Sequence, residues 1–557
     1  MFTRSLPVAR ASGSGWWSTV VALTLFAILL SPLFSHRLHS TRVQGQMEPT
    51  TRRGADEGGG PYERLIIRGV TLIDGTGAPP RGPMDVVVEG DRIAEVRSVG
   101  YPGLPINDRR RPQGATRELD GTGMYLLPGF VDTHVHTGGV PKAPQAEYVY
   151  KLWLGHGVTT VRGVPFGGFD WSLEEKALSE ANEIVAPRMF SYHRPGSGWD
   201  QGPVQDAETA RDWVRWLAAY EVDGVKADGV KLGAEDPEIM AALIDEAQRH
   251  GLGTVAHLDQ MGVVRMTALD AARLGMDMMT HYYGLMESML EGTSIQDWPV
   301  DYNYNNEQDR FGNVAHLWHQ SAEPGSQKWN HLIQEFVELD FAMDPTLVIY
   351  DAGRDLMKAM TLEWHEEYTL PSLWEYYQPS RAAHGSYWYD WGTEEEYHWK
   401  KFYQKWLHFL NDFKNAGGTV TVGTDSGFIF STFGFEYVQE LEMLREAGFH
   451  PSEVIRAATY LGAKELFEPT GQAMEFGIIR PGMKADLVLV GENPLANLKV
   501  LYGTGALRLD EENGGFKRVG GVEYTIKDGI VYDANQLLAD VREMVREAKE
   551  AAGPQGM

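Results

Sequence analysis

We expect the fold to be decided by Gly123-Met124-Tyr125-Leu126-Leu127-Pro128-Gly129-Phe130-Val131-Asp132-Thr133-His134-Val135-His136. This run predicts a short apolar strand that stops at two histidines, His134 and His136. Side chains at positions i and i+2 of a strand point to the same face, so both imidazoles could bind one metal ion. Two histidines that merely alternate on a half-buried strand are the alternative, and further ligands downstream would decide between the two.

Composition limits the classes of protein that the chain can belong to. At 557 residues, with 43% hydrophobic and 23% charged residues, it fits a folded protein with one large and one smaller domain. The net charge of −27 argues against nucleic-acid binding, which needs clustered lysine and arginine. Cysteine is absent, so a metal would have to be held by histidine, carboxylate or modified lysine.

The first residues predict export. Arg4 and Arg10 precede an apolar segment, 20–30, whose length suits the hydrophobic part of a signal peptide better than a membrane span. Because no clear cleavage site follows, a retained membrane anchor that tethers the chain to a membrane is the alternative for residues 1–35. We expect a periplasmic, extracellular or outward-facing anchored protein, and a flexible linker at residues 36–62.

Strand signals gather at both ends of the chain. Short β-branched runs between turn residues occur at 65–67, 70–74, 84–88, 92–96, 485–490, 522–526 and 530–532. Two such ends around a long middle predict one small β-sandwich built from residues 63–125 and 469–535. A C-terminal helix and tail, 536–557, would follow.

The middle of the chain, residues 126–468, alternates strand and helix signals. Strands are expected at 157–162, 230–232, 253–257, 276–281, 341–350 and 418–423, and helices at 207–219, 236–250 and 263–274. Such alternation over this length predicts an α/β fold, a (β/α)8 TIM barrel inserted into the sandwich. Active sites of barrels form at the carboxyl ends of the strands. The expected strand ends carry His134, His136, Lys231, His257, His281 and Asp425.

These residues and their order resemble the amidohydrolase superfamily of metal-dependent hydrolases, in its imidazolonepropionase-like and Xaa-Pro dipeptidase-like branch. The resemblance covers about residues 64–533. It rests on Leu127-Pro128-Gly129-Phe130-Val131-Asp132-x-His134-x-His136, Gly157-Val158-Thr159-Thr160-Val161-Arg162, Ala256-His257, Thr280-His281, Gly423-Thr424-Asp425-Ser426 and Ile479-x-Pro481-Gly482-x-Lys484-Ala485-Asp486-Leu487.

The resemblance implies a binuclear centre with two divalent metal ions, most often Zn²⁺. His134, His136 and Asp425 would bind the more buried ion, and His257 and His281 the other. A carboxylated Lys231 would bridge the two ions. Lys226 lies in a similar local pattern and is the alternative bridge, and a single-ion site with an unmodified lysine is the alternative to both.

The expected activity is hydrolysis of a carbon–nitrogen bond in an amide, peptide or cyclic amide by a metal-bridging hydroxide. Xaa-Pro dipeptides and N-acyl amino acids are candidate substrates. Asp425 would carry the proton to the leaving nitrogen, with His257 or His281 steadying the oxyanion. The alternatives are hydrolysis of esters or lactones, and a binding or scaffold protein whose site is degenerate.

Candidate substrate contacts are Arg162, His193, Tyr282 and Tyr283, for each of which simple packing is the alternative. Residues 355–395 are rich in aromatic rings and could form either a pocket wall or an accessory core. A small molecule or short peptide is the expected substrate, nucleic acid is not expected as a partner, and a homo-oligomer is the expected assembly.

Overall fold

The deciding run of sequence crosses from one part of the fold to another. In the computed structural model, which describes residues 47, 49–292, 302–303, 306–380 and 385–553, residues Tyr125–Pro128 form strand β5 and Phe130–Val135 form β6. Gly129 lies between the two strands. A Cβ atom there would lie 2.1 Å from the hydroxyl oxygen of Thr159, so only glycine fits this crossing without a shift of its neighbour.

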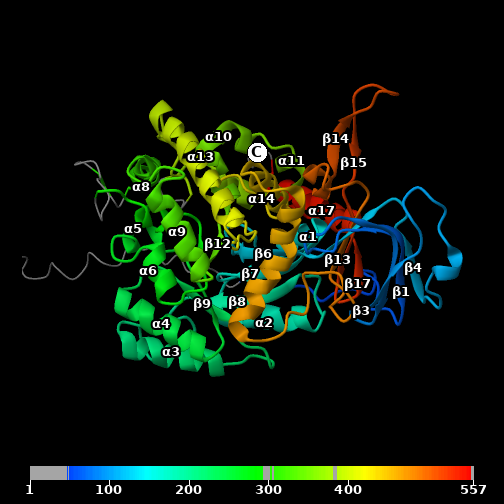
Figure 1. Cartoon of the computed structure of the whole chain (residues 1–557), viewed down its shortest axis with the longest axis horizontal. Helices are drawn as coiled ribbons and strands as arrows, with labels where there is room; N and C mark the ends of the chain where they lie inside the picture. Colours follow the sequence, from blue (N-terminus) through cyan, green and yellow to red (C-terminus); the bar gives the residue numbers. More distant parts are fainter. Residues whose placement is uncertain (1–46, 48, 293–301, 304–305, 381–384, 554–557) are drawn as a thin grey trace, which may run out of the picture. The chain divides into compact units, whose positions relative to one another are not determined.

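The large central part is a nearly closed parallel barrel (Figure 1). Its sheet has seven strands in the order β12-β11-β10-β9-β8-β7-β6. Besides β6 these are β7 (Val158–Gly163), β8 (Arg188–His193), β9 (Gly229–Leu232), β10 (Gly253–Ala256), β11 (Met278–Thr280) and β12 (Ala342–Asp344).

An extended segment, residues 419–425, occupies the eighth position of the barrel. The amide of Met343 in β12 donates to the carbonyl oxygen of Thr419, and the amide of Thr133 in β6 donates to that of Val422, each at 2.9 Å. The segment therefore joins β12 to β6 and closes the ring. It is not a regular strand, since one isolated bridge, Met343 to Val420, is its pairing in the described residues.

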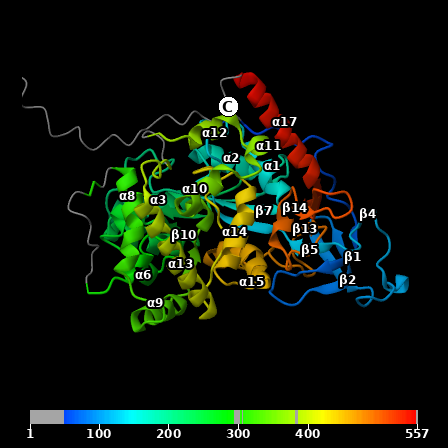
Figure 2. The same cartoon turned by 90° about the horizontal axis from the view of Figure 1, so that it is seen from above.

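Helices surround this barrel (Figure 2). The long amphipathic α13 carries a row of buried aromatic rings that includes Trp399, Phe402 and Trp406. The helices are α1 (Ala146–Gly155), α2 (Phe169–Glu180), α3 (Ala207–Ala219), α4 (Pro237–Arg249), α5 (Asp259–Gly262), α6 (Ala268–Arg273), α7 (Leu285–Ser288), α8 (Glu307–Val314), α9 (Gln327–Glu338), α10 (Asp351–Met360), α11 (His365–Tyr368), α12 (Pro371–Tyr377), α13 (Thr393–Asn415), α14 (Phe435–Glu446), α15 (Pro451–Arg456), α16 (Gly462–Phe467) and α17 (Ala534–Ala552).

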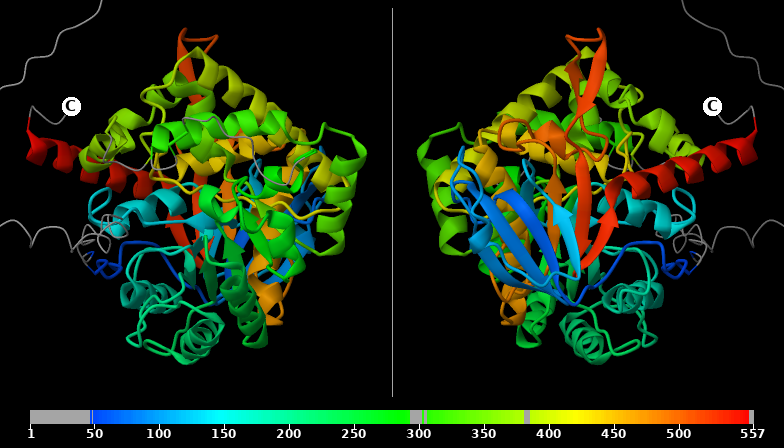
Figure 3. Two further views of the ribbon diagram at one scale, coloured as in Figure 1. Left: turned by 90° about the vertical axis from the view of Figure 1, so that its left-hand side faces the viewer. Right: turned by 90° about the vertical axis from the view of Figure 1, so that its right-hand side faces the viewer.

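Both ends of the chain contribute strands to one eight-stranded sheet (Figure 3). Its path is β17-β16-β13-β5-β1-β2-β3, with β4 paired to β1. The strands are β1 (Leu65–Leu72), β2 (Arg81–Glu89), β3 (Arg92–Ser98), β4 (Arg117–Asp120), β13 (Leu487–Val490), β16 (Val522–Lys527) and β17 (Ile530–Asp533), and a separate hairpin joins β14 (Ala506–Leu509) to β15 (Phe516–Val519).

Several predicted elements are corrected. The strand predicted at 341–350 ends at Asp344, because Thr346 adopts a positive φ of 48° and a short 3-10 helix, Leu347–Tyr350, follows. The helix predicted at 263–274 begins only at Ala268, where Thr267 caps it. The runs at 65–67 and 70–74 form a single strand, and β8 was not predicted.

The predicted signal peptide or anchor, residues 1–35, and residues 36–46 and 48 of the predicted linker lie outside the described residues. Within the described part of the chain, no helix combines the length and the apolar character that crossing a membrane requires.

Candidate metal centre

The predicted ligands come together at the carboxyl end of the barrel. His134 lies in β6 and His136 just after it, while His257 and His281 directly follow β10 and β11. Asp425 ends the segment that closes the barrel, where its amide donates a 2.8 Å hydrogen bond to the carbonyl oxygen of His134. Parallel strands that end at one edge of the barrel thus gather five polar side chains.

The carboxylate of Asp425 is the common neighbour of three imidazoles. Its Oδ1 lies 3.4 Å from Nε2 of His136 and 3.8 Å from Nε2 of His134. Its Oδ2 lies 3.7 Å from Nε2 of His281. One ligand atom each of His134, His136 and Asp425 lie within 4.8 Å of one another, which makes them a group that could hold a metal ion.

Hydrogen bonds behind the rings orient two of the histidines. Nδ1 of His136 lies 2.6 Å from the carbonyl oxygen of Pro165 and must donate to it, because a carbonyl only accepts. Nδ1 of His281 lies 2.5 Å from the hydroxyl of Thr346. In both rings Nε2 then faces Asp425, the arrangement in which metal-binding histidines are held by their outer neighbours.

Burial keeps the imidazoles neutral. It lowers the pKa of His136 to about 3 and outweighs the hydrogen bond to Pro165, which raises that pKa. The pKa values of His134 and His281 also lie well below the ordinary value, through burial first and the charge of Lys231 second. Neutral imidazoles are the form that binds a metal, so the ring nitrogens are ready as ligands at neutral pH.

The two candidate lysines lie in different surroundings. Lys231, in β9, is 1% exposed, and its Nζ lies 3.4 Å from the hydroxyl of Thr280, next to His281. Burial lowers its pKa well below the ordinary value, which favours the neutral amine. Lys226 is exposed, and its Nζ reaches the carbonyl oxygen of Ala218 on α3. These positions favour Lys231 over Lys226 as a ligand.

His257 completes the row of rings. Its ring centroid lies 4.6 Å from that of His281, and the ring of Tyr283 stacks on its other side at 4.6 Å. The Tyr283 hydroxyl lies 3.1 Å from that of Tyr350. Tyr283 therefore lies beside a predicted ligand, as a substrate contact would.

Three other predicted substrate contacts, Tyr282, Arg162 and His193, lie buried in packed surroundings. Tyr282 is fully buried, with rings that include Phe402 and Trp406 around it. Arg162 is 2% exposed, and its Nε donates to the carbonyl oxygen of Thr133 at 2.7 Å inside the barrel. His193 is 1% exposed beneath the ring of Phe169, which lies 4.4 Å away.

Two buried carboxylates near the ligands were not among the predicted site residues. Asp344 ends β12, and its Oδ2 accepts from Thr133 Oγ1 at 3.0 Å and lies 3.9 Å from Nδ1 of His134. Burial raises the pKa of Asp344 to about 6. Asp132 accepts from the amide and hydroxyl of Thr424, at 3.1 and 2.8 Å, and so fixes the residue before Asp425.

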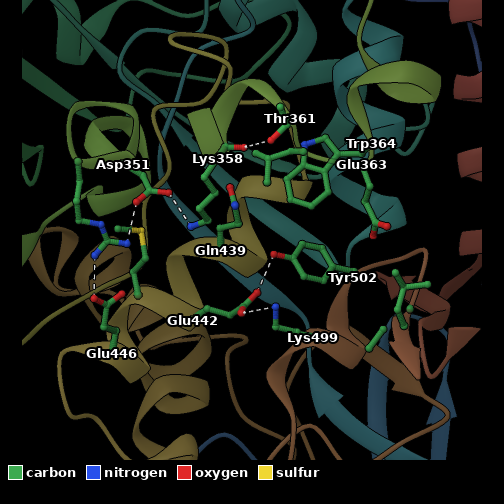
Figure 4. Close-up of a pocket in the computed structure, with 16 residues that line it drawn as sticks. Asp351, Lys358, Thr361, Glu363, Trp364, Gln439, Glu442, Glu446, Lys499 and Tyr502 are labelled. Carbon is green, nitrogen blue, oxygen red and sulfur yellow. Dashed lines mark hydrogen bonds and ion pairs between the residues drawn. The ribbon is translucent and has the colours of Figure 1, made fainter. Parts of the chain in front are cut away.

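A separate pocket of about 580 Å³ contains none of the predicted ligands (Figure 4). It lies beside α10 and α14. Several of its charged groups are paired within the wall: Asp351 with Lys358 at 2.9 Å, and Glu442 with Lys499 at 3.3 Å. Paired charges give a ligand little to bind, so the strand ends of the barrel are the better candidate site.

The donor set fits a divalent ion. Imidazole nitrogens and a carboxylate are ordinary zinc ligands, and the buried Nε2 of His281, which faces Asp425, has no hydrogen-bond partner in the described residues. Buried polar atoms without partners are uncommon, and at such a site an ion can supply the missing contact.

Comparisons with known proteins agree with this fold. No protein-family model matches the chain. It is 31% identical over 156 residues to an N-acyl-D-aspartate deacylase from Alcaligenes xylosoxydans xylosoxydans, in an alignment covering 28% of this chain and 25% of that relative. The chain thus spans a quarter of the length of this curated relative.

Solved structures match most of the chain. A bottromycin amidohydrolase has a TM-score of 0.56 at 20% identity, covering 87% of this chain and 91% of its own. A Xaa-Pro dipeptidase with bound methionine has a TM-score of 0.54 at 17% identity, covering 84% and 100%. At these identities the likeness shows the fold. The curated relatives and the solved structures together point to the amidohydrolase superfamily.

Proposed function

We propose that this protein is a metal-dependent hydrolase that cleaves a carbon–nitrogen bond of an amide, peptide or cyclic amide. The observation that carries the proposal is the carboxylate of Asp425, within 3.4 to 3.8 Å of Nε2 atoms of three neutral histidines. The names of the relatives support the choice of bond, since they include deacylases, a dipeptidase and an amidohydrolase. Ester and lactone hydrolysis need the same groups and are tested alongside.

His134, His136 and Asp425 would hold one divalent ion, and His257 and His281 a second. Zn²⁺ suits these nitrogen and oxygen donors. We propose that a carboxylated Lys231 joins the two, because a buried neutral amine can take up CO₂ and become an anionic oxygen ligand. When bound, such ions polarise a carbonyl and lower the pKa of a water ligand towards 7.

The residues of the chain then move the proton. Asp425, held by its own amide at the strand end, accepts the proton of the attacking water and returns it to the leaving nitrogen. The pKa values of His134, His136 and His281 lie too low for them to carry a proton at neutral pH.

The test joins metal analysis with a hydrolysis screen of dipeptides, N-acyl amino acids, cyclic amides, esters and lactones. We expect about two divalent ions per chain, as the predicted donor set can hold. Lys231→Met should lower both metal content and activity, while the matched control Lys226→Met should change neither. Metal-free protein that is inactive on every substrate would make the scaffold alternative correct.

We also propose that the chain is exported, on the basis of Arg4, Arg10 and the apolar segment 20–30. Fractionation of the native host followed by N-terminal sequencing tests this. Mature protein in the cytosol with Met1 still present would contradict it.

A further inference from the structure

A buried lysine lies near the predicted ligands without a carboxylate to pair with. Lys142, in the loop that follows β6, is 6% exposed. Its Nζ lies 3.1 Å from the ring centroid of Phe428 and 4.1 Å from that of Tyr376. Among the residues that the structure describes, no carboxylate oxygen lies within 4.0 Å of Lys142 Nζ, so the lysine forms no ion pair there. Lys142, Tyr376 and Phe428 are called the lysine clamp below.

The clamp is built from three separate parts of the chain. Its lysine stands on a turn in which the amide of Lys142 donates to the carbonyl oxygen of Gly139 at 3.0 Å. The hydroxyl of Ser372 in α12 donates to the carbonyl oxygen of Lys142 at 2.7 Å, which ties α12 and its Tyr376 to this turn. Phe428 comes three residues after Asp425, so the clamp and the candidate metal centre share one loop.

The charge of Lys142 interacts with two predicted ligands of the candidate metal centre, Asp425 and His136. Burial lowers the pKa of Lys142 to about 7, and the charge of Asp425 raises it in part. The charge of Lys142 in turn lowers the pKa of His136. The amine is therefore close enough to act on two predicted ligands, although it forms no ion pair with Asp425.

Two aromatic faces do not fully replace water around an ammonium. A cation–π contact stabilises a cation by about 0.5 to 2 kcal/mol, whereas burial of one ion costs several. When Asp425 is engaged by a divalent cation, less of its charge remains to act on Lys142. The ammonium group then lacks a full counter-charge. Because the two rings carry no net charge, an anionic ligand is the partner that would neutralise it.

We propose that Lys142 binds a carboxylate that the substrate already carries, so that the enzyme prefers amides whose leaving amine bears a free carboxylate next to the cleaved bond. This inference rests on the proposed hydrolysis and names its substrate class. It also gives part of the aromatic-rich segment 355–395 a role, since Tyr376 of α12 holds the amine in place.

The experiment compares one dipeptide with a free C-terminal carboxylate against the same dipeptide capped as its amide. In Lys142→Met, kcat/KM for the free acid should fall about 10- to 100-fold, mostly through KM, as expected for loss of a hydrogen bond to a charged group. The capped dipeptide should change less than about twofold. Lys499→Met removes the same charge from an exposed site, 61% of whose side chain is open, and should alter neither substrate.

A second measurement needs no turnover. Calorimetry compares 4-phenylbutanoate, a carboxylate without an amide, with the neutral 4-phenylbutan-1-ol on metal-loaded protein. We expect the acid to bind the parent protein more tightly than the alcohol, and Lys142→Met to remove that preference. Equal loss for the free and capped dipeptides, or an unchanged preference for the acid in the variant, overturns the role of Lys142. Parent protein that hydrolyses nothing refutes the proposed function, while the calorimetry still decides the clamp.

Discussion

Arg188 fastens the barrel to the terminal sheet, and its replacement by methionine should destabilise the protein strongly. Arg188 begins β8, while Asp486 precedes β13 and Asp528 lies in the turn between β16 and β17. Its guanidinium donates to both carboxylates. All three residues are buried, at 8%, 3% and 5% exposure. Methionine fills similar space, but it leaves the buried Asp486 without its arginine and Asp528 with its lysine partners alone.

Removal of one partner from a buried ion pair costs about 3 to 5 kcal/mol. We expect the lower end of this range, because Lys484 still lies 2.9 Å from Asp528, and the amide of Asp528 still donates to Asp486 at 2.9 Å. Burial alone would raise the pKa of Asp528, and the charges of Arg188, Lys527 and Lys484 lower it overall. This carboxylate therefore stabilises the fold above its ordinary pKa, and its contribution is lost as the pH falls through the lowered value.

The destabilisation caused by Arg188→Met should be larger at neutral pH than at acid pH. In the variant, the pKa of Asp528 rises towards its ordinary value, so its protonation as the pH falls relieves part of the cost of losing Arg188. Urea unfolding followed by tryptophan fluorescence should show a large loss in the free energy of unfolding at pH 7.5 and a smaller loss at pH 4.5. The control Arg211→Met breaks partly exposed pairs and should cost less than about 1 kcal/mol. A loss below 1 kcal/mol, or one that does not vary with pH, would refute this reasoning.

Three further predictions concern single sites. Asp425→Asn should lower kcat by about 10²- to 10⁴-fold on any substrate found, with metal content measured beside it; a metal-loaded variant with parent turnover would exclude the proton role. Gly129→Ala should lower stability by about 1 to 3 kcal/mol in thermal unfolding, and Thr159→Ala in the same chain should restore part of it, because the clash is with that side chain. Burial raises the pKa of Glu465 to about 8, so its ionisation destabilises the fold as the pH rises through that value; Glu465→Gln should raise the melting temperature at pH 9 but not at pH 5, and the reverse order would contradict it.

Much of the barrel could be predicted because each short strand ends in a chemically distinct residue. The ligand order from His134 to Asp425 was readable without the structure, and the fold brings these side chains together at one end. The sequence pattern does not predict β8, because this strand begins at Arg188 and ends at His193, which leaves a short apolar run with no helix directly after it. Asp344 is not predicted as a site residue, because the strand predicted at 341–350 extends beyond it and so does not place it at a strand end.

The clamp could not have been found from local sequence. Lys142 follows a proline in a loop with no distinctive pattern. Its two rings come from α12 and from the loop after Asp425, more than 200 residues further along. Only tertiary structure brings such distant residues together, and the same holds for Arg188 and its two carboxylates. Periodicity reports which face of an element is buried, but not which element it meets.

The eight-stranded sheet constrains the order in which the protein can be made. β5 pairs with β13, and Leu127 meets Val488 about 360 residues later in the chain. At about 5 to 20 residues per second, a ribosome needs roughly 20 to 70 seconds to deliver that partner. During this interval the nascent β5 has an open edge of apolar residues. Premature termination before β13 would therefore leave an aggregation-prone fragment rather than a smaller folded protein. Chaperones that shield nascent strands should matter more for this chain than for a barrel without a shared terminal sheet.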